Sequence, residues 1–377
     1  MRTTKSHFSA AVRHENKNRV YRYLYALEEP VTKQDLAYSL SMSLPTLTQN
    51  LNELLAENLI DNSEIADSTG GRRPRVISLR RDARFAVGIE LSRHHIRMVA
   101  VDLGVNVLGW RVIDRRFSAD GAYAQSLWQD LRAFLEGLAL DTDRLLGVGV
   151  TLPGIVSSDQ AVLEDAHTLD VVRLELGWLA AGSPYPVFFS NDANAGGFAE
   201  WWNQDIKGCM IYLSLERGVG GAILMNGTAY LGQRTRAAEF GHMCIHPEGR
   251  PCSCGRRGCL EAYCSTARLS DDLGIGLERF FDGVNAGSRR YTALWDAYLD
   301  DLVIGISNIH TAFDSGIVLG GKISKFLLQR FEELDSRLKK ADPDYRGNEY
   351  LSICRYHAQS SGIGAALHFV DQFITEL

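Results

Sequence analysis

The chain has 377 residues, of which 45% are hydrophobic and 23% are charged, so it is long enough for two or three globular domains. This composition excludes an intrinsically disordered chain and a small disulfide scaffold. The first ten residues lack the apolar segment of a signal peptide, and no stretch reaches the roughly 18 uncharged apolar residues of a membrane span, so we expect a cytoplasmic protein without membrane insertion.

The formal net charge of −6 is distributed unevenly along the chain. Residues 1–81 carry 12 Lys and Arg against 9 Asp and Glu, a net charge of +3, whereas the remainder carries a net charge of −9. A basic segment on an acidic body fits contact with nucleic acid at one end only. A chance distribution of a few charges would give the same imbalance, so the charge alone does not decide.

The first part of the chain has the pattern of three short helices. Apolar residues recur at helical spacing over residues 16–27, which predicts the first helix. We expect the second helix to begin after Thr32, whose hydroxyl can cap it. A turn over residues 41–43 then leads to a third helix over residues 44–58, with Ser43 as its N-cap.

The third predicted helix is amphipathic. On one side it carries Leu44, Leu47, Leu51, Leu54 and Leu55, which we expect to pack on the other helices. The opposite side is polar and could contact base edges and phosphates if the helix enters the major groove. The candidate DNA contacts are Pro45, Thr46, Gln49 and Asn52. A solvent-exposed helix face has the same pattern, but the order of helix, short turn and helix favours DNA binding.

Residues 59–79 have the pattern of a polar hairpin, the wing of such a domain. Its glycine-rich tip carries three arginines, Arg72, Arg73 and Arg75. Arginine in a flexible loop can enter a narrow minor groove, although a charged linker between domains would explain the same residues. We therefore interpret residues 1–81 as a winged helix-turn-helix domain that binds double-stranded operator DNA.

From residue 85 the pattern becomes that of an α/β protein. Three successive strands, a helix and two further strands are expected over residues 85–91, 96–102, 107–113, 122–138, 146–151 and 187–190. A second unit of the same kind is expected to open with strands over residues 210–215 and 221–224. Long helices are expected over residues 292–313, 323–338 and 361–374.

Four segments of this body resemble the ROK family, whose name abbreviates repressor, open reading frame and kinase. They are Leu-Pro-Gly-Ile-Val at residues 152–156, Asn-Asp-Ala-Asn-Ala at 191–195, Glu-Phe-Gly-His at 239–242 and the cysteine-rich stretch at 252–261. The resemblance runs from the head through the C-terminal helix. It implies the duplicated, ribonuclease-H-like fold of actin and hexokinase, in which a sugar cleft lies between two lobes.

That fold implies a division of the body into two lobes. The first lobe would comprise residues 82–198, completed by the C-terminal helix at residues 361–377. The second lobe would comprise residues 199–360 and would carry the cysteine-rich loop and the sugar site.

Seven cysteines are present, an odd number that favours metal ligation over disulfides. Cys252, Cys254 and Cys259 lie within eight positions, and together with His242 they offer three thiolates and one imidazole. This donor set suits a closed, tetrahedral, structural Zn²⁺ site. Buried free cysteines are the alternative, but they explain three cysteines in a glycine-rich loop poorly. We therefore expect structural Zn²⁺ as the cofactor.

The resemblance also implies a set of residues that bind sugar hydroxyls, namely Asn191, Asp192, Glu239, His242 and Glu261. Their carboxylates tell against an anionic ligand. In kinase relatives, the residue at position 192 would be the general base that accepts the proton of the attacking hydroxyl. Each residue alone also has a simpler interpretation, since Asn-Asp-Ala-Asn is a common helix start with Asp as a cap.

One hairpin departs from the kinase pattern. Kinase members carry an Asp-x-Gly-Gly-Thr turn whose glycines let backbone amides approach the phosphates, whereas residues 90–95 read Glu-Leu-Ser-Arg-His-His. Glycine-rich turns at residues 216–221 and 318–321 remain, and these can also be simple tight turns. We therefore expect a protein that binds a sugar without being an enzyme.

These observations together predict a sugar-responsive transcriptional repressor of carbohydrate genes. We expect a homodimer or homotetramer in which a neutral sugar relieves repression. Two alternatives remain: an active ATP-dependent sugar kinase with a DNA-binding head, and a repressor controlled by a protein partner.

Overall fold

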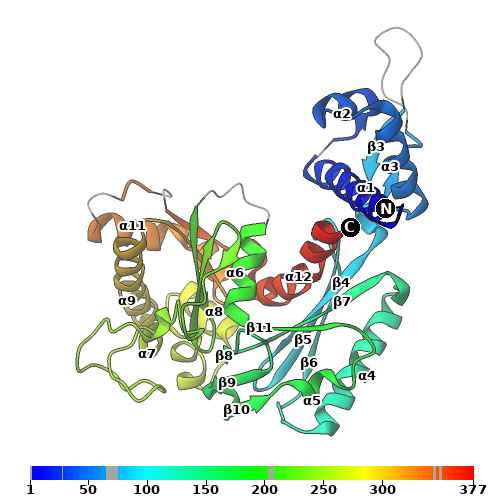
Figure 1. Cartoon of the computed structure of the whole chain (residues 1–377). Helices are drawn as coiled ribbons and strands as arrows, with labels where there is room; N and C mark the ends of the chain where they lie inside the picture. Colours follow the sequence, from blue (N-terminus) through cyan, green and yellow to red (C-terminus); the bar gives the residue numbers. More distant parts are fainter. Residues whose placement is uncertain (1, 28, 65–74, 203–207, 343–344, 348–349) are drawn as a thin grey trace.

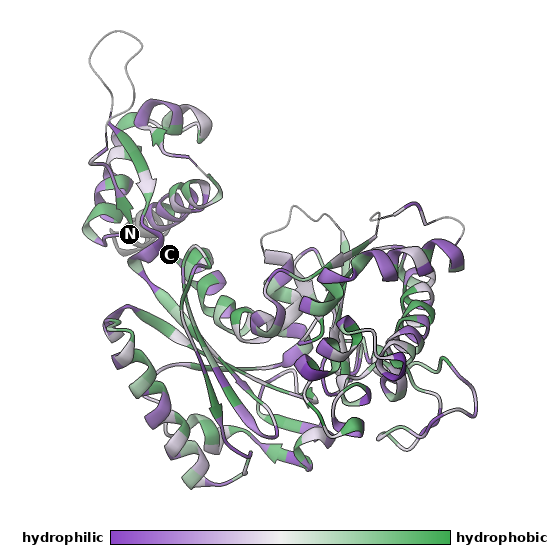
Figure 2. Ribbon diagram, turned by 180° about the vertical axis from the view of Figure 1, so that it is seen from behind, coloured by the Kyte–Doolittle hydropathy of each residue, from purple (hydrophilic) through white to green (hydrophobic). Residues whose placement is uncertain are grey.

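The structure is a computed structural model that describes all residues except 1, 28, 65–74, 203–207, 343–344 and 348–349. A small N-terminal head lies at one end of a larger two-lobed body (Figure 1), and the C-terminus of the chain lies beside the head. Figure 2 shows hydrophobic residues concentrated along the strands of the body. Within the described residues, no helix combines the length and apolar character needed to cross a membrane.

The head consists of three helices and a small antiparallel sheet. The helices are α1 (Arg2–Ala26), α2 (Lys33–Ser39) and α3 (Leu44–Ala56). The strands are β1 (Val31–Thr32), β2 (Ile60–Asp61) and β3 (Val76–Leu79), in the order β1-β3-β2. The head is thus a helical region with a small sheet that precedes the body, and its assignment as a winged helix-turn-helix stays a prediction. The first helix begins much earlier than predicted. Most of residues 2–15 are polar, and the apolar residues among them, Phe8, Ala10, Ala11 and Val12, span too short a stretch to have indicated a helix.

Helices α2 and α3 of the head have side-chain N-caps and bury apolar residues. The Thr32 hydroxyl accepts a hydrogen bond from the backbone N–H of Asp35 at 3.3 Å, and the Ser43 hydroxyl accepts one from that of Thr46 at 3.4 Å, as predicted. Burial separates the leucines of α3: Leu47, Leu51 and Leu54 are buried, Leu55 is half-buried, and Leu44 in the first turn is 48% exposed.

The first lobe is built on a five-stranded sheet of order β11-β7-β4-β5-β6. Its strands are β4 (Phe85–Leu91), β5 (His95–Asp102), β6 (Val107–Asp114), β7 (Leu145–Leu152) and β11 (Val187–Asn191). The first three pair antiparallel, and β7 is parallel to both β4 and β11. Helix α4 (Gly121–Gly137) packs on one face of the sheet, and α12 (Ser360–Glu376) packs on the other.

Four short elements of this lobe were not predicted. A three-stranded antiparallel sheet of order β10-β9-β8 comprises β8 (Ile155–Val156), β9 (Val162–Ala166) and β10 (Val171–Glu175), and α5 (Gly177–Ala180) follows it. These strands have two to five residues and mix exposed with buried positions irregularly, so they lack the alternation that marks a strand in a sequence.

The second lobe repeats the pattern of the first. Its sheet, of order β14-β13-β12-β15-β16, comprises β12 (Cys209–Leu215), β13 (Val219–Met225), β14 (Thr228–Ala229), β15 (Gly316–Gly320) and β16 (Leu351–Ile353). Here too the first three strands pair antiparallel and the last two add in parallel. This repetition confirms the duplicated, two-lobed α/β fold.

Helices cover both faces of the second sheet. On one face lies α6 (Asp192–Trp202), which also packs against α12. On the other side the core includes α8 (Leu277–Asn285), α9 (Arg289–Phe313), α10 (Ser324–Gln329) and α11 (Phe331–Ala341), with α7 (Glu261–Cys264) in the loop region. The predicted division of the chain at residues 81 and 198 stays a prediction.

The prediction of a single helix over residues 323–338 is wrong, because the structure has two helices there, α10 and α11. The break lies at Arg330, whose φ of −123° and ψ of 26° leave the helical region. The Arg330 guanidinium donates to the side chains of Glu333 and Asn285, which holds the corner. Apolar periodicity continues through such a break, so the pattern could not reveal it.

Helix α12 packs unusually close to the first sheet. A Cβ atom added to Gly88 of β4 would lie 1.7 Å from the carbonyl oxygen of Gly362 in α12. Only glycine permits this approach of helix backbone to strand backbone. The helix is thereby fixed against the sheet whose strands end at the cavity described next.

Candidate functional site

A cavity of about 940 Å³ lies between the two lobes. Its first-lobe wall includes Gly154, Asp165 and His167, and its second-lobe wall includes the turn at residues 218–221, Glu239 and Glu261. Helix α12 contributes Gly364, His368 and Asp371. All five residues predicted to bind a sugar, Asn191, Asp192, Glu239, His242 and Glu261, line this cavity.

Asn191 and Asp192 lie where β11 ends and α6 begins. The Asn191 side-chain amide donates to the backbone oxygen of Gly154 at 2.8 Å and to Asp192 Oδ1 at 3.1 Å. Asn191 Oδ1 accepts from the backbone N–H of Asn194 at 2.9 Å, and Asp192 Oδ1 accepts from that of Ala193 at 2.8 Å. These bonds hold both side chains at the cavity wall.

The environment of Asp192 perturbs its ionisation. Burial and then the nearby carboxylate of Glu90 raise the pKa of Asp192 to about 7, and Glu216 and Glu239 add to the rise. Burial likewise raises the pKa of Glu239, although His242 and Arg236 partly offset it. The cavity is therefore lined by carboxyl groups, which are poor partners for an anion and good acceptors of hydrogen bonds from hydroxyl groups.

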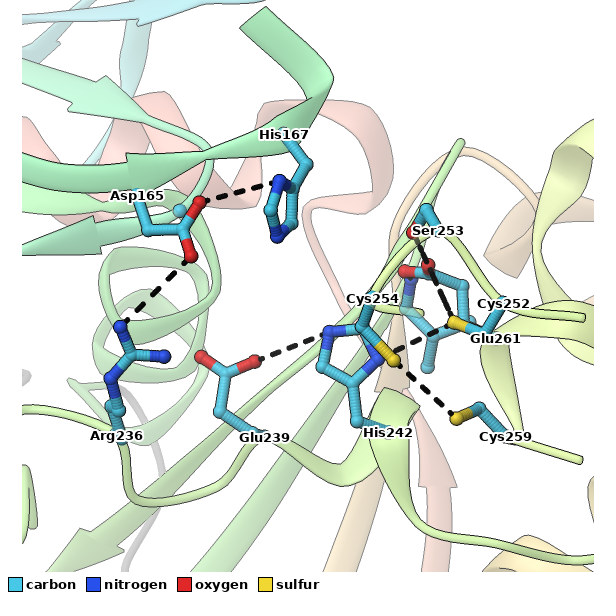
Figure 3. Close-up of polar contacts among 12 residues, drawn as sticks. Asp165, His167, Arg236, Glu239, His242, Cys252, Ser253, Cys254, Cys259 and Glu261 are labelled. Carbon is cyan, nitrogen blue, oxygen red and sulfur yellow. Dashed lines mark hydrogen bonds and ion pairs between the residues drawn. The ribbon is translucent and has the colours of Figure 1, made fainter. Parts of the chain in front are cut away.

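The side chains of Glu239, His242 and Glu261 come from the second lobe (Figure 3). His242 Nε2 lies 3.9 Å from Glu239 Oε2, while the other ring nitrogen, Nδ1, lies 3.7 Å from Cys252 Sγ. Glu261 Oε2 accepts from the backbone N–H of Val219 at 3.0 Å, and Oε1 accepts from the Ser253 hydroxyl at 2.9 Å. The histidine can thus face the cavity and the cysteine cluster at the same time.

His242, Cys252, Cys254 and Cys259 form a cluster whose ligand atoms all lie within 4.8 Å of one another. The Cys254 and Cys259 sulfurs are 3.8 Å apart. In a tetrahedral zinc site with Zn–S bonds of about 2.3 Å, two sulfurs are separated by about 3.8 Å. The donor set and its spacing therefore fit a metal ion of the zinc type.

The backbone of the cysteine loop depends on glycine. Gly258 has a φ of +76°, and a Cβ atom there would lie 1.8 Å from the backbone oxygen of His246. A side chain would therefore push Cys259 away from the other three ligands.

The hairpin between β4 and β5 is closed by contacts of its own. The backbone N–H of Ser92 donates to the backbone oxygen of His95 at 2.9 Å. Arg93 donates to Asp170 through both terminal nitrogens, one of these bonds measuring 3.1 Å, and to the backbone oxygen of Thr168 at 3.4 Å. On β4, the Glu90 carboxylate pairs with Arg97, and both side chains are largely buried.

Four of the candidate DNA-contact residues lie on α3. Pro45, Gln49 and Asn52 are exposed and line one shallow groove, whereas the Thr46 hydroxyl is 2.8 Å from the Ser43 hydroxyl within the helix cap. Arg75 is exposed and lies immediately before β3. Arg72 and Arg73 lie outside the described residues.

The head is attached to the end of α12. The Asn18 side chain donates to the backbone oxygens of Ile374 and Thr375 at 3.3 and 2.8 Å. The Arg22 guanidinium donates to the same two oxygens at 3.3 and 3.1 Å. These oxygens would otherwise lack partners at a helix C-terminus, where a positive charge is also favourable. One helix therefore lines the cavity and ends on the head.

Sequence reasoning missed three polar residues of the cavity: Asp165, His167 and Arg236. Asp165 Oδ2 lies 4.0 Å from Arg236 Nη2, and Asp165 Oδ1 lies 3.4 Å from His167 Nδ1. No motif marks these residues, and Arg236 meets Asp165 only when the two lobes fold against each other.

Comparisons with known proteins agree with the fold. Residues 86–372 match the ROK family. The chain is 26% identical over 356 residues to the xylose repressor of Bacillus subtilis, covering 92% of each chain. It is also 26% identical over 267 residues to the N-acetylglucosamine repressor of Escherichia coli O157:H7, covering 68% of this chain and 64% of that one.

Two solved structures show the same fold. One is a ROK family transcriptional regulator, a homolog of the E. coli MLC protein, with a TM-score of 0.75, 23% identity and 97% of each chain covered. The other is a ROK family glucokinase from Streptomyces griseus in complex with glucose and AMPPNP, with a TM-score of 0.61 and 21% identity. That match covers 75% of this chain and 98% of the glucokinase.

Proposed function

The chain belongs to the ROK family, and on that premise we propose that it is a cytoplasmic, sugar-responsive transcriptional repressor. The observation that carries this proposal is the connection of two sites by one helix: α12 lines the cavity between the lobes and ends in hydrogen bonds to the head. The relatives named as xylose and N-acetylglucosamine repressors support it, since the first covers nearly the whole chain.

The proposed effector is a neutral sugar. Asn191, Asp192, Glu239, His242 Nε2 and Glu261 would bind its hydroxyl groups. Carboxylates accept hydrogen bonds from hydroxyl groups. Several carboxylates in one cavity would also repel a phosphate or carboxylate ligand.

The proposed metal is a structural Zn²⁺ held by His242, Cys252, Cys254 and Cys259. When bound, it supplies no chemistry beyond fixing these four ligands in one arrangement. Coordination through His242 Nδ1 would leave Nε2 as a donor toward the cavity. The same loop carries Ser253, which donates to Glu261, so the metal would also stabilise a sugar-binding carboxylate.

We do not expect phosphoryl transfer. The hairpin at residues 92–95 holds Arg93 against Asp170 instead of presenting glycine amides to a nucleotide, and the Glu90 carboxylate is occupied by Arg97. In the second lobe, Glu216 accepts from the backbone N–H of Lys322 at 2.8 Å. Because ROK kinases are also structural neighbours, ATP turnover is the direct check.

The head would bind double-stranded operator DNA through the exposed face of α3 and the wing, with Pro45, Thr46, Gln49, Asn52 and the wing arginines as contacts. A homodimer or homotetramer would place two heads on two half-sites. Sugar binding would change the angle between the lobes and, through α12, the position of the heads. If the sugar prefers the arrangement that does not bind DNA, operator DNA must weaken sugar binding by the same factor.

Calorimetric titration with neutral pentoses, hexoses and N-acetylated sugars tests this proposal. The purified, zinc-loaded protein should bind one sugar saturably, and Asp192→Asn should abolish binding. The matched control is Asp282→Asn, an exposed residue of α8, which should bind normally. Absence of any sugar binding would favour a protein partner as the effector, and heat on adding ATP-Mg with sugar would indicate a kinase.

A further inference from the structure

Two charged groups of the cavity lie on opposite lobes and face each other. Asp165 is in β9 of the first lobe, and Arg236 is in the loop after β14 of the second lobe. Their nearest atoms are 4.0 Å apart. Figure 3 shows Asp165 and His167 on one side of the cavity, opposite Glu239 and His242, with Arg236 reaching toward Asp165. This contact therefore bridges the two lobes at the sugar cavity.

A ligand can change the lobe angle only if its contacts differ between the open and closed arrangements. Glu239, His242 and Glu261 all belong to the second lobe, and α6, which begins at Asp192, packs on the second sheet. Among the predicted sugar ligands, Asn191 at the end of β11 is the one that lies on the first sheet, and its side-chain amide already donates to the backbone oxygen of Gly154 and to Asp192 Oδ1. Further polar contacts from the first lobe would therefore strengthen the coupling of sugar binding to lobe closure.

Asp165 has an acceptor atom that lacks a partner. Its Oδ1 atom is buried and receives no hydrogen bond from the described residues, although His167 Nδ1 lies 3.4 Å away. A buried carboxylate oxygen without a donor is costly, and most such atoms in proteins have a partner. A ligand hydroxyl in the adjoining cavity would supply the missing donor.

We propose, building on the proposed function, that Asp165 and His167 are further ligand-binding residues contributed by the first lobe. Arg236 is the partner from the second lobe that holds Asp165 when the cavity is occupied. The ligand would be a neutral polyol with hydroxyl groups at two separated positions. One group of hydroxyls would bind Glu239 and Asp192, and the other would bind Asp165. Occupancy by such a ligand draws the lobes together.

Arg93 is a positioning residue for this subsite. His167 opens a short 3₁₀ turn, His167–Leu169, and the Arg93 guanidinium donates to the backbone oxygen of Thr168 and to the carboxylate of Asp170 at the end of that turn. The hairpin that departs from the kinase pattern thus supports the turn that carries His167. An arginine at this position has a role that glycine could not perform.

The test uses the full-length, zinc-loaded protein with xylose, glucose and N-acetylglucosamine as probes. Calorimetry measures affinity, and small-angle X-ray scattering measures the contraction on saturation. Asp165→Asn and His167→Ala should each weaken binding of the recognised sugar by about tenfold or more, because each removes a hydrogen bond to a charged or polar group. Arg236→Gln should bind the sugar with an affinity within about threefold of the parent's. It should not contract on saturation, because Arg236 acts between the lobes.

Matched variants separate this role from a loss of folding. Arg234→Gln changes an exposed arginine two positions upstream that does not line the cavity, and it should retain both affinity and contraction. Arg93→Gln should weaken sugar binding, and Arg93→Lys should restore part of it. All variants should keep the parent zinc content and melting temperature within a few degrees.

The outcomes are distinguishable. Parent-like affinity in Asp165→Asn and His167→Ala would overturn the subsite, and parent-like contraction in Arg236→Gln would overturn the bridge between the lobes. Failure of the parent protein to bind any probe would contradict the proposed function itself, and with it this inference.

Discussion

Replacing Asp192 with asparagine tests the electrostatics of the cavity. Burial and the carboxylate of Glu90 raise the pKa of Asp192 from its ordinary value of 3.8 to about 7. The folded state therefore binds a proton more tightly than the unfolded state, so the ionised carboxylate destabilises the folded protein. This penalty grows as the pH rises from about 4 and is complete above about pH 7.

The magnitude follows from the difference between the two pKa values. One pKa unit corresponds to about 1.4 kcal/mol, so the full difference corresponds to about 4 kcal/mol. Because Asp192 is only half-buried and solvent can screen its charge, we expect Asp192→Asn to stabilise the ligand-free protein by about 2 kcal/mol at pH 8 and by about half of that at pH 5.5.

Differential scanning calorimetry of the zinc-loaded protein at these two pH values measures the effect. The expected gain at pH 8 is about 4 °C or more in the melting temperature of the body. Asp282→Asn, which changes an exposed carboxylate, should shift the melting temperature at neither pH. An unchanged melting temperature of Asp192→Asn at pH 8, or an equal gain at both pH values, would refute the reasoning.

Three further predictions concern the other sites. A strong zinc chelator should release a single metal ion per chain and lower the melting temperature, and Cys254→Ser should reproduce the loss, as measured by metal analysis and calorimetry. The double variant Asn18→Ala with Arg22→Ala removes four hydrogen bonds to α12; it should keep sugar affinity but lose the effect of sugar on DNA binding, as measured by fluorescence anisotropy. Gln49→Ala and Asn52→Ala should each weaken binding to the preferred DNA by about tenfold and leave calorimetric sugar binding unchanged.

Controls make these predictions specific. Cys209→Ser changes a cysteine outside the cluster and should retain the metal. Gln372→Ala changes an exposed residue of α12 and should retain the coupling. Metal retention by Cys254→Ser, or full coupling in the Asn18 and Arg22 double variant, would contradict the roles assigned to these residues. Unchanged DNA affinity in both α3 variants would show that this helix does not read the bases.

Much of the fold could be predicted because its signals are local. The caps at Thr32 and Ser43 depend on side chains within three positions of the bonds they make. The strand over residues 85–91 has its predicted limits, since it opens with five consecutive buried apolar residues and six of its seven residues are buried. The break at Arg330 and the short strands β8, β9 and β10 could not be predicted, because tertiary contacts and not periodicity determine them.

Part of the candidate site could likewise be predicted from the sequence, and part could not. Asp192, Glu239 and the cysteine loop lie in motifs, so the sequence predicted that they would meet, and the structure brings them to one cavity. Asp165 and Arg236 are distant in the sequence and meet only across the two lobes. The attachment of Asn18 to the end of α12 joins opposite ends of the chain, which no local pattern could indicate.

The most direct test of a sugar-responsive repressor is the linkage between its two sites. Double-stranded DNA enriched from a random pool on the purified protein serves as the operator, and its affinity is measured with and without the sugar that calorimetry identifies. We predict that the sugar weakens DNA binding and that the DNA weakens sugar binding by the same factor. A sugar that binds in the cavity and leaves DNA affinity unchanged would contradict this function.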